Sequence, residues 1–131
     1  MYIYYNPNPA GSERAADCVI RAITKATDST WDKVYIGLSV YGFAFSTWGN
    51  NNTVWDAYLR DLGFNRYAIP NTCPNCYTVE DFAEDHPKGT FILGIGDHAV
   101  TVQDGNWFDS WNSGGEVPIL YYTMEVDNGI Q

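Results

Sequence analysis

The stretch Thr90–Trp111, TFILGIGDHAVTVQDGNWFDSW, decides the fold of this 131-residue chain. Apolar residues recur along it at the period of two that is typical of β-strands, and Gly-Asp and Asp-Gly pairs interrupt it where turns are expected. We expect strands over Thr90–Ile95, His98–Gln103 and Asn106–Trp111, followed by a strand over Val117–Val126. Strands that follow one another across such short breaks predict an antiparallel sheet.

The residues before Gly89 follow a period of 3.6 instead, which is typical of amphipathic helices. We expect helices over residues 18–26, 29–42 and 53–63, and a short one from residue 78 that ends before Pro87, with capping residues Asp17, Ser29, Thr53 and Thr78. Short strands are expected at Tyr2–Tyr5 and Arg66–Ile69. Helices first and strands afterwards predict an α+β fold, in a single domain over residues 1–131.

The Asp104-Gly105 dipeptide predicts the register of one strand pair, because it favours a two-residue type I′ turn. In that register Trp111 lies opposite His98, and Asp109 is a diagonal neighbour of His98 on the same face of the sheet. The side chains expected on this face are those of His98, Val100, Trp107, Asp109 and Trp111. A three-residue turn would instead place Asn112 opposite His98 and turn Asp109 away.

Cys18 is the candidate nucleophile, because it follows Asp17 at the start of a predicted helix. The positive end of a helix dipole lowers the pKa of a thiol, and the thiolate is the nucleophilic form. His98 and Asp109 follow Cys18 in the order of nucleophile, base and orienting carboxylate that thiol hydrolases use. Since the thiol belongs to the helical half and the imidazole to the sheet half, we expect the site in a cleft between them.

The segment Cys73-Pro74-Asn75-Cys76 has three interpretations. It is half of a zinc site, with Asp81 and His86 as the nearby candidates for further ligands, or a redox-active pair, or an inert loop with reduced thiols. We favour the reduced loop, because a second ligand pair and a βαβ pattern are both missing from the sequence. We expect His86 to cap the end of a helix, and we expect no metal and no cofactor.

Aromatic residues make up 16% of the chain, which is a high fraction. Most are expected in the core, whereas Trp48, Trp107 and Trp111 are candidates for lining a substrate groove. An exposed aromatic patch would alternatively mark a protein interface.

The net charge of −9 argues against a partner with a phosphate backbone, so no nucleic acid is expected. The N-terminal residues do not read as a signal peptide, and the apolar runs are too short to cross a membrane. With three cysteines and no export signal, we expect a reducing compartment and therefore a cytoplasmic protein.

Around Cys18, His98 and Asp109 the chain resembles the papain-like cysteine peptidases, in particular the leader peptidases of bacteriocin exporters, in which an Asp-Cys or similar pair starts the central helix. Over nearly its full length it resembles small cysteine-peptidase-like proteins of bacteriophages and prophages of Firmicutes. The stretches that carry this resemblance are YNPNP (residues 5–9), DCVIRA (17–22), YTVEDF (77–82) and WFDSW (107–111).

The resemblance implies a papain-like fold, with Cys18 as nucleophile, His98 as general base and Asp109 as the residue that orients it. Papain-like peptidases usually carry a Gln six residues before the nucleophile as an oxyanion donor, and here that position is Ser12. Ser12, Asn6 and Asn8 are the candidate donors in its place, beside the backbone N–H of Cys18.

The function expected from these residues is that of a cysteine hydrolase, which cleaves a peptide or isopeptide bond of a protein or peptide substrate through an acyl-enzyme on Cys18. The alternative from another class is a non-catalytic, acidic binding protein that inhibits a host defence protein. A small structural module stabilised by zinc is a third possibility.

Overall fold

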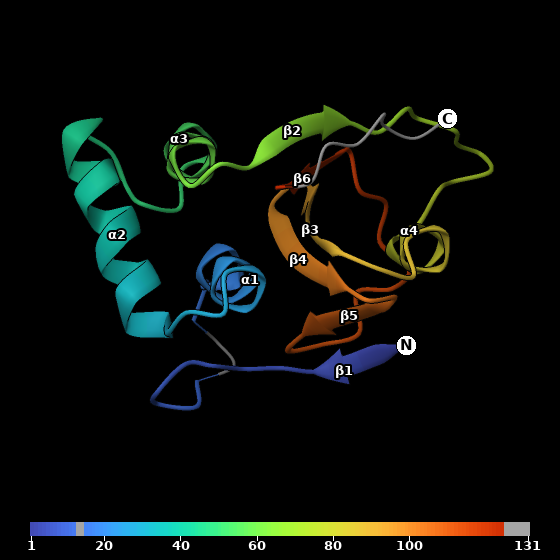
Figure 1. Ribbon diagram of the computed structural model, residues 1–131, viewed down its shortest axis with the longest axis horizontal. Helices are drawn as coiled ribbons and strands as arrows, with labels where there is room; N and C mark the ends of the chain where they lie inside the picture. The colour runs from blue at the N-terminus through green and yellow to red at the C-terminus, as the bar shows by residue number, and fades with distance from the viewer. Residues whose placement is uncertain (13–14, 125–131) are drawn as a thin grey trace.

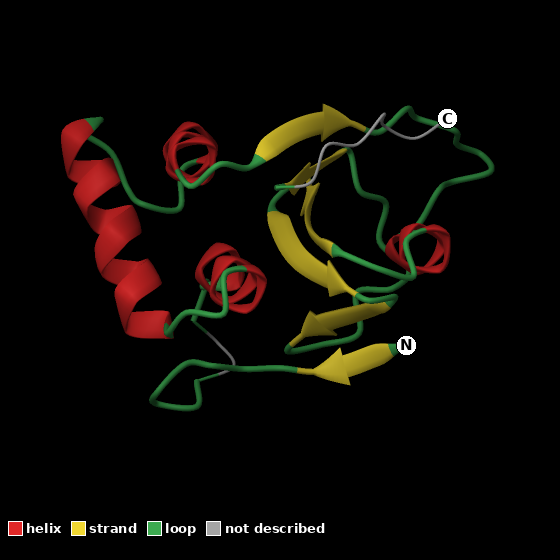
Figure 2. Ribbon diagram, in the orientation of Figure 1, coloured by secondary structure: helices red, strands yellow, loops and turns green. Residues whose placement is uncertain are grey.

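A computed structural model describes residues 1–12 and 15–124, and within them the chain forms helices on both sides of a mixed sheet (Figure 1). The helices are α1 (Cys18–Ala26), α2 (Trp31–Ala44), α3 (Asn52–Asp61) and α4 (Val79–Asp85). The strands are β1 (Tyr2–Tyr4), β2 (Asn65–Ala68), β3 (Thr90–Ile95), β4 (His98–Gln103), β5 (Asn106–Asp109) and β6 (Leu120–Thr123). Figure 2 shows α1, α2 and α3 on one side of the sheet and α4 on the other. The predicted α+β class is confirmed.

The six strands lie in the order β1-β5-β4-β3-β6-β2. The four C-terminal strands pair antiparallel, as predicted, and β2 also joins β6 antiparallel. The N-terminal strand makes the sheet mixed at one edge, because β1 pairs parallel with β5. Beyond β1, the backbone N–H of Tyr5 donates to the carbonyl of Asp109 (2.9 Å).

Two of the predicted strands are shorter than expected. The strand predicted over Asn106–Trp111 ends at Asp109, and the one predicted over Val117–Val126 is paired only over Leu120–Thr123. Residues 125 and 126 lie outside the described part of the chain.

The sheet is buried on both faces, and alternate residues of β3 and β4 belong to different cores. Ile92 and Ala99 pack with α1, α2 and α3, whereas Leu93 and Val100 pack with α4. Alternate side chains of these strands therefore face two different apolar cores, instead of a core on one side and solvent on the other.

Helix α1 lies against β4, between the sheet and α2. Its apolar residues Val19, Ala22 and Ile23 are buried, and the carbonyl of Ala22 accepts a hydrogen bond from Oγ1 of Thr101 in β4 (2.6 Å). This contact holds α1 alongside β4, so the first residue of the helix is near the first residue of the strand.

Capping residues bound two further helices. The predicted capping box of Thr78 and Asp81 at α4 is confirmed, since each side chain accepts from the other's backbone N–H. At α2 the N-cap is Thr30 and not Ser29; the Thr30 hydroxyl accepts from the N–H of Lys33 (3.3 Å).

The connection from β2 to α4 contains Cys73 and Cys76, which form a disulfide with each other. The expectation of a reduced loop is therefore wrong. Figure 1 shows this connection on the α4 side of the sheet, away from α1. Among the helices of the described residues, none has both the length and the apolar character that a membrane span needs.

Candidate active site

Cys18 is the first residue of α1 and the free cysteine of this chain, with its side chain partly buried. Asp17 is the N-cap residue of α1, as predicted, but its carboxylate makes no capping hydrogen bond. One oxygen of Asp17 accepts from Nη1 of Arg21 (2.8 Å) and the other from Nε1 of Trp31 (2.9 Å). The carboxylate is thus directed away from the backbone N–H groups of the first helical turn.

The predicted hairpin brings His98 and Asp109 together. Asp104 and Gly105 both have positive φ, as a type I′ turn requires, and Val102 pairs with Trp107 in the expected register. Nε2 of His98 donates to Oδ2 of Asp109 across 2.7 Å. The predicted contact between these two residues, which followed from the two-residue turn, is confirmed.

On its other side, His98 interacts with the thiol of Cys18 through a hydrogen bond and through its charge. Burial by itself raises the pKa of Cys18, but the hydrogen bond and charge of His98, the N–H of Ala99 and the charge of Arg21 outweigh it. The net pKa of Cys18 is lowered.

Burial acts on His98 in the opposite sense and is likewise outweighed. It lowers the pKa of the imidazole, whereas the hydrogen bonds and charges of Asp109 and Cys18 raise that pKa to about 9. The lowered pKa of the thiol and the raised pKa of the imidazole both favour the thiolate–imidazolium form of the pair. This is the reactive form of a cysteine nucleophile.

Asp109 is completely buried, and its carboxylate is fully hydrogen-bonded. Besides His98, it accepts from Nη2 of Arg21 (2.9 Å), Oγ of Ser113 (2.7 Å) and the N–H of Ser110 (2.8 Å). Burial raises its pKa, but these donors and the nearby cations outweigh burial, so the pKa is lowered. Asp109 therefore stays ionised opposite the imidazolium.

Arg21 connects the two carboxylates of the site. Its side chain is buried, and its guanidinium bonds Asp17 with one nitrogen and Asp109 with another. The sequence analysis gave Arg21 no role in the site, although its spacing from Asp17, four positions along a helix, is that of an ion pair. That spacing does not reveal that Arg21 and Asp17 are both buried.

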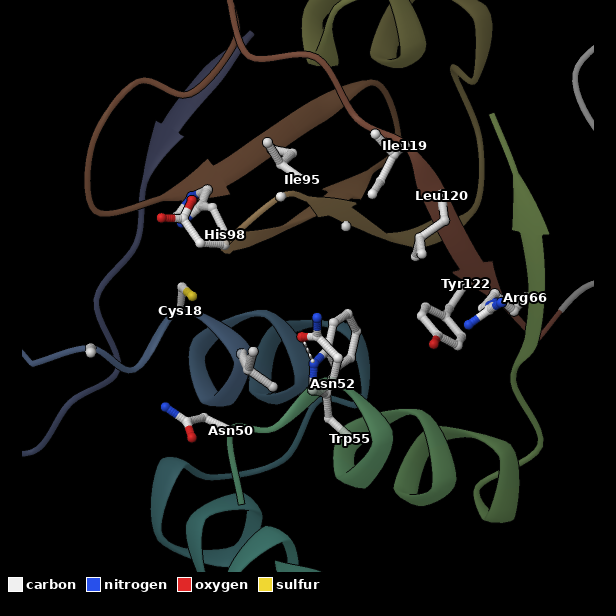
Figure 3. Close-up of a pocket in the computed structure, with 15 residues that line it drawn as sticks. Cys18, Asn50, Asn52, Trp55, Arg66, Ile95, His98, Ile119, Leu120 and Tyr122 are labelled. Carbon is white, nitrogen blue, oxygen red and sulfur yellow. Dashed lines mark hydrogen bonds between the residues drawn. The ribbon is translucent and has the colours of Figure 1, made fainter. Parts of the chain in front are cut away.

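A pocket of about 440 Å³ opens beside Cys18 and His98 (Figure 3). It lies between the helices α1 and α3 and the strands β3 and β6. Its lining residues are Ala16, Cys18, Val19, Asn50, Asn52, Trp55, Arg66, Gly94, Ile95, Gly96, Asp97, His98, Ile119, Leu120 and Tyr122. The expected cleft between the helical half and the sheet half is therefore present.

No protein-family model, curated protein or solved structure matches this chain. The geometry of the site alone therefore carries the functional argument.

The three tryptophans expected in a substrate groove lie in three different places. Trp111 packs against His98 with its ring tilted and the ring centroids 4.9 Å apart, and it is partly exposed. Trp48 lines a neighbouring hollow that shares Ala16 and Asn50 with the pocket. Trp107 was assigned wrongly: it is buried in the core on the α4 side, since β5 directs it there beside Val102.

The candidate oxyanion donors Asn6, Asn8 and Ser12 are not among the described residues that line the pocket. The amide of Asn6 donates to the carbonyl of Ser12 (3.4 Å), and that of Asn8 donates to Asp17 (3.3 Å). These asparagines therefore shape the turn before α1 and do not reach the pocket.

Asn52 is an amide in the pocket that the sequence analysis missed. Its carbonyl oxygen accepts from Nε1 of Trp55 (2.9 Å), which leaves its NH₂ group to face the cavity, as Figure 3 shows. The signal for it was its position directly before the helix predicted over residues 53–63, at the end of the run Asn50-Asn51-Asn52.

Asn112, the alternative orienting residue, is engaged elsewhere. Its side-chain oxygen accepts from Nε1 of Trp107 (2.9 Å) and from the N–H of Gly114 (3.0 Å).

His86 and the disulfide lie apart from the pocket. Nδ1 of His86 contacts the carbonyl of Phe82 (2.8 Å), which confirms the predicted cap at the end of α4. Within the described ranges, no three His, Cys, Asp or Glu side chains cluster as metal ligands would.

Proposed function

We propose that this protein is a cysteine hydrolase that cleaves a peptide or isopeptide bond through an acyl-enzyme on Cys18. The observation that carries the proposal is the chain of hydrogen bonds from Cys18 through His98 to the buried Asp109. A nucleophile at a helix start, with a base and its orienting carboxylate on the sheet, is also what a papain-like fold would provide. We propose that fold; the Cys73–Cys76 disulfide argues against the reducing compartment that was expected from the sequence.

In the proposed reaction the thiolate of Cys18 attacks the carbonyl carbon of the scissile amide. The resulting oxyanion lies at the N-terminus of α1, where the N–H groups of the first turn have no helical partners. The imidazolium of His98 then gives its proton to the leaving amine as the C–N bond breaks.

The thioester formed in this way is released by water. Neutral His98 takes a proton from the water molecule, the resulting hydroxide attacks the thioester carbonyl, and the thiolate of Cys18 leaves. Asp109 keeps the imidazole in place and stabilises its charged form throughout.

The proposal is tested with internally quenched peptide libraries that include Lys-linked isopeptides, together with an epoxysuccinyl electrophile followed by mass spectrometry. We expect cleavage and selective labelling of Cys18, both lost in Cys18→Ala and both kept in a Cys73→Ser/Cys76→Ser control. Absence of cleavage together with absence of labelling would refute the proposal.

The second candidate is a non-catalytic binding protein. Its support is the net charge of −9 and two well exposed aromatic residues of the neighbouring hollow, Phe43 (87% exposed) and Trp48 (82% exposed). Inhibition of a partner that survives Cys18→Ala and weakens with salt would favour it.

A further inference from the structure

The pocket beside Cys18 has a cation at its far end. Figure 3 shows Cys18 and His98 at one end of the pocket, and Arg66 beside Tyr122 at the other. Among the described lining residues, Arg66 is the only arginine or lysine. In a chain with a net charge of −9, a cation in the candidate substrate groove requires an explanation.

The positive charge of Arg66 is only partly neutralised by its ion pair. Its guanidinium lies 3.7 Å from a carboxylate oxygen of Asp56 and also contacts the hydroxyl of Tyr122. Asp56 is shared, since it pairs more closely with Arg60 (3.0 Å) and accepts from Tyr122. Two arginines face one carboxylate, so the cluster carries an excess positive charge.

The position of Arg66 directs this excess charge into the groove. Strand β2 pairs Arg66 with Tyr122 of β6, and both residues line the pocket. About half of the Arg66 side chain is exposed, so its remaining N–H donors are accessible to a ligand.

The walls between the two ends suit a peptide. Val19, Trp55 and Leu120 form apolar surface, and the NH₂ group of Asn52 is available to a backbone carbonyl. A chain whose scissile carbonyl lies at Cys18 would pass over these walls and bring a neighbouring group to Arg66.

We propose that Arg66 binds a carboxylate of the substrate, so that the substrate class is a peptide with an acidic group a few residues from the scissile bond. The inference rests on the proposed hydrolase function. The carboxylate belongs to an Asp or Glu side chain or to a free C-terminus, because the guanidinium of Arg66 can donate hydrogen bonds to either one. The net negative charge of the chain opposes long-range attraction of such a substrate, so this recognition acts at contact.

The test compares matched peptides. A peptide that the protein cleaves is taken from the quenched library and made with Glu or Gln at each position, and with a free or an amidated C-terminus. A charge-assisted hydrogen bond contributes about 1.5–3 kcal/mol, so we expect kcat/KM to be at least about tenfold higher for one acidic form than for its neutral partner.

Two variants assign that preference to a residue. Arg66→Gln should lower kcat/KM for the acidic peptide by more than for the neutral peptide, so that the preference is lost, and Arg66→Glu should transfer the preference to a Lys-containing peptide. Arg60→Gln is the matched control, because Arg60 shares Asp56 but is not among the lining residues, and it should keep the preference. Thermal melting of each variant checks that it is folded.

The outcomes separate the two proposals. Cleavage with no acidic preference, or equal losses on both peptides in Arg66→Gln, would show that Arg66 is only part of a surface ion cluster, and hydrolysis would still stand. If the preference resides in the Glu series, the ligand is a side chain; if it resides in the free C-terminus, the ligand is the terminal carboxylate. Failure to cleave any peptide would reject both the hydrolase function and this inference.

Discussion

Arg21 and Asp109 form an ion pair of 2.9 Å, and both side chains are almost completely buried. Arg21 is one turn along the helix that Cys18 begins, and Asp109 ends the strand that orients His98. The same guanidinium also holds Asp17, next to Cys18. One buried cation therefore connects the helix that carries the thiol to the strand whose Asp109 bonds His98.

Replacing Arg21 by Met should strongly destabilise the protein. The change removes the cation but leaves the carboxylates of Asp17 and Asp109 buried, and a broken buried pair costs about 3–5 kcal/mol. The free energy of unfolding in urea measures this cost. The matched control is Arg60→Gln, which breaks a half-exposed pair and should cost about 0–1 kcal/mol. Equal losses in the two variants would contradict the role assigned to Arg21.

Asp109→Asn should lower kcat by at least about 100-fold with little change in KM, because a misplaced base loses acid–base catalysis while substrate contacts remain. Asn112→Ala should leave kcat nearly unchanged and instead cost about 1–3 kcal/mol of stability, since the indole N–H of the buried Trp107 loses its acceptor. Steady-state kinetics and urea unfolding separate the two effects. A large kcat defect in Asn112→Ala alone would exclude Asp109 as the orienting residue.

Alkylation of Cys18 by iodoacetamide should be faster than that of an ordinary thiol at every pH below the ordinary thiol pKa, because more of Cys18 is thiolate there. The pKa of Cys18 is lowered, so its thiolate is lost only as the pH falls through that lowered value. His98→Ala removes the main stabilising partner, and the rate should then rise only near the ordinary thiol pKa. Identical pH profiles for the two proteins would contradict the thiolate–imidazolium pair.

The same pair predicts the alkaline limit of hydrolysis. The pKa of His98 is raised to about 9, so its proton is present below that pH and is lost as the pH rises through it. Since the leaving amine needs this proton, kcat/KM should fall above about pH 9, whereas alkylation of Cys18 should not. A fall in kcat/KM centred near the ordinary histidine pKa would show that Asp109 does not hold the imidazolium.

The Cys73→Ser/Cys76→Ser variant should retain full activity, because the disulfide lies on the α4 side of the sheet and away from the pocket. Closing so short a loop contributes about 2 kcal/mol in the chain-entropy model, which sets the expected loss in stability. Thiol titration of the denatured wild-type protein should count one free thiol before reduction and three after it. Three free thiols before reduction would exclude the disulfide.

Local sequence signals predicted much of the site. The Asp104-Gly105 turn predicted the strand register, and the register predicted the contact between His98 and Asp109, because both depend on neighbouring residues alone. The first helix was predicted with its observed bounds for the same reason.

What the sequence missed depends on contacts between distant segments. Periodicity cannot show that β1 joins β5, or that both faces of the sheet are buried, which is why Trp107 was placed in the groove. Arg21 was given no role because charged side chains are rarely buried, and only the fold reveals the two carboxylates beside it.

The parallel pairing of β1 with β5 has a consequence for how the protein is made. The backbone carbonyl of Asp109 accepts from the N–H of Tyr5 (2.9 Å) and the hydroxyl of Tyr2 (3.1 Å), so the segment around β1 holds the residue that contacts His98. A ribosome must translate more than a hundred residues between these partners. A nascent chain therefore carries the thiol of Cys18 well before it carries the histidine and the aspartate that lie beside it in the folded protein.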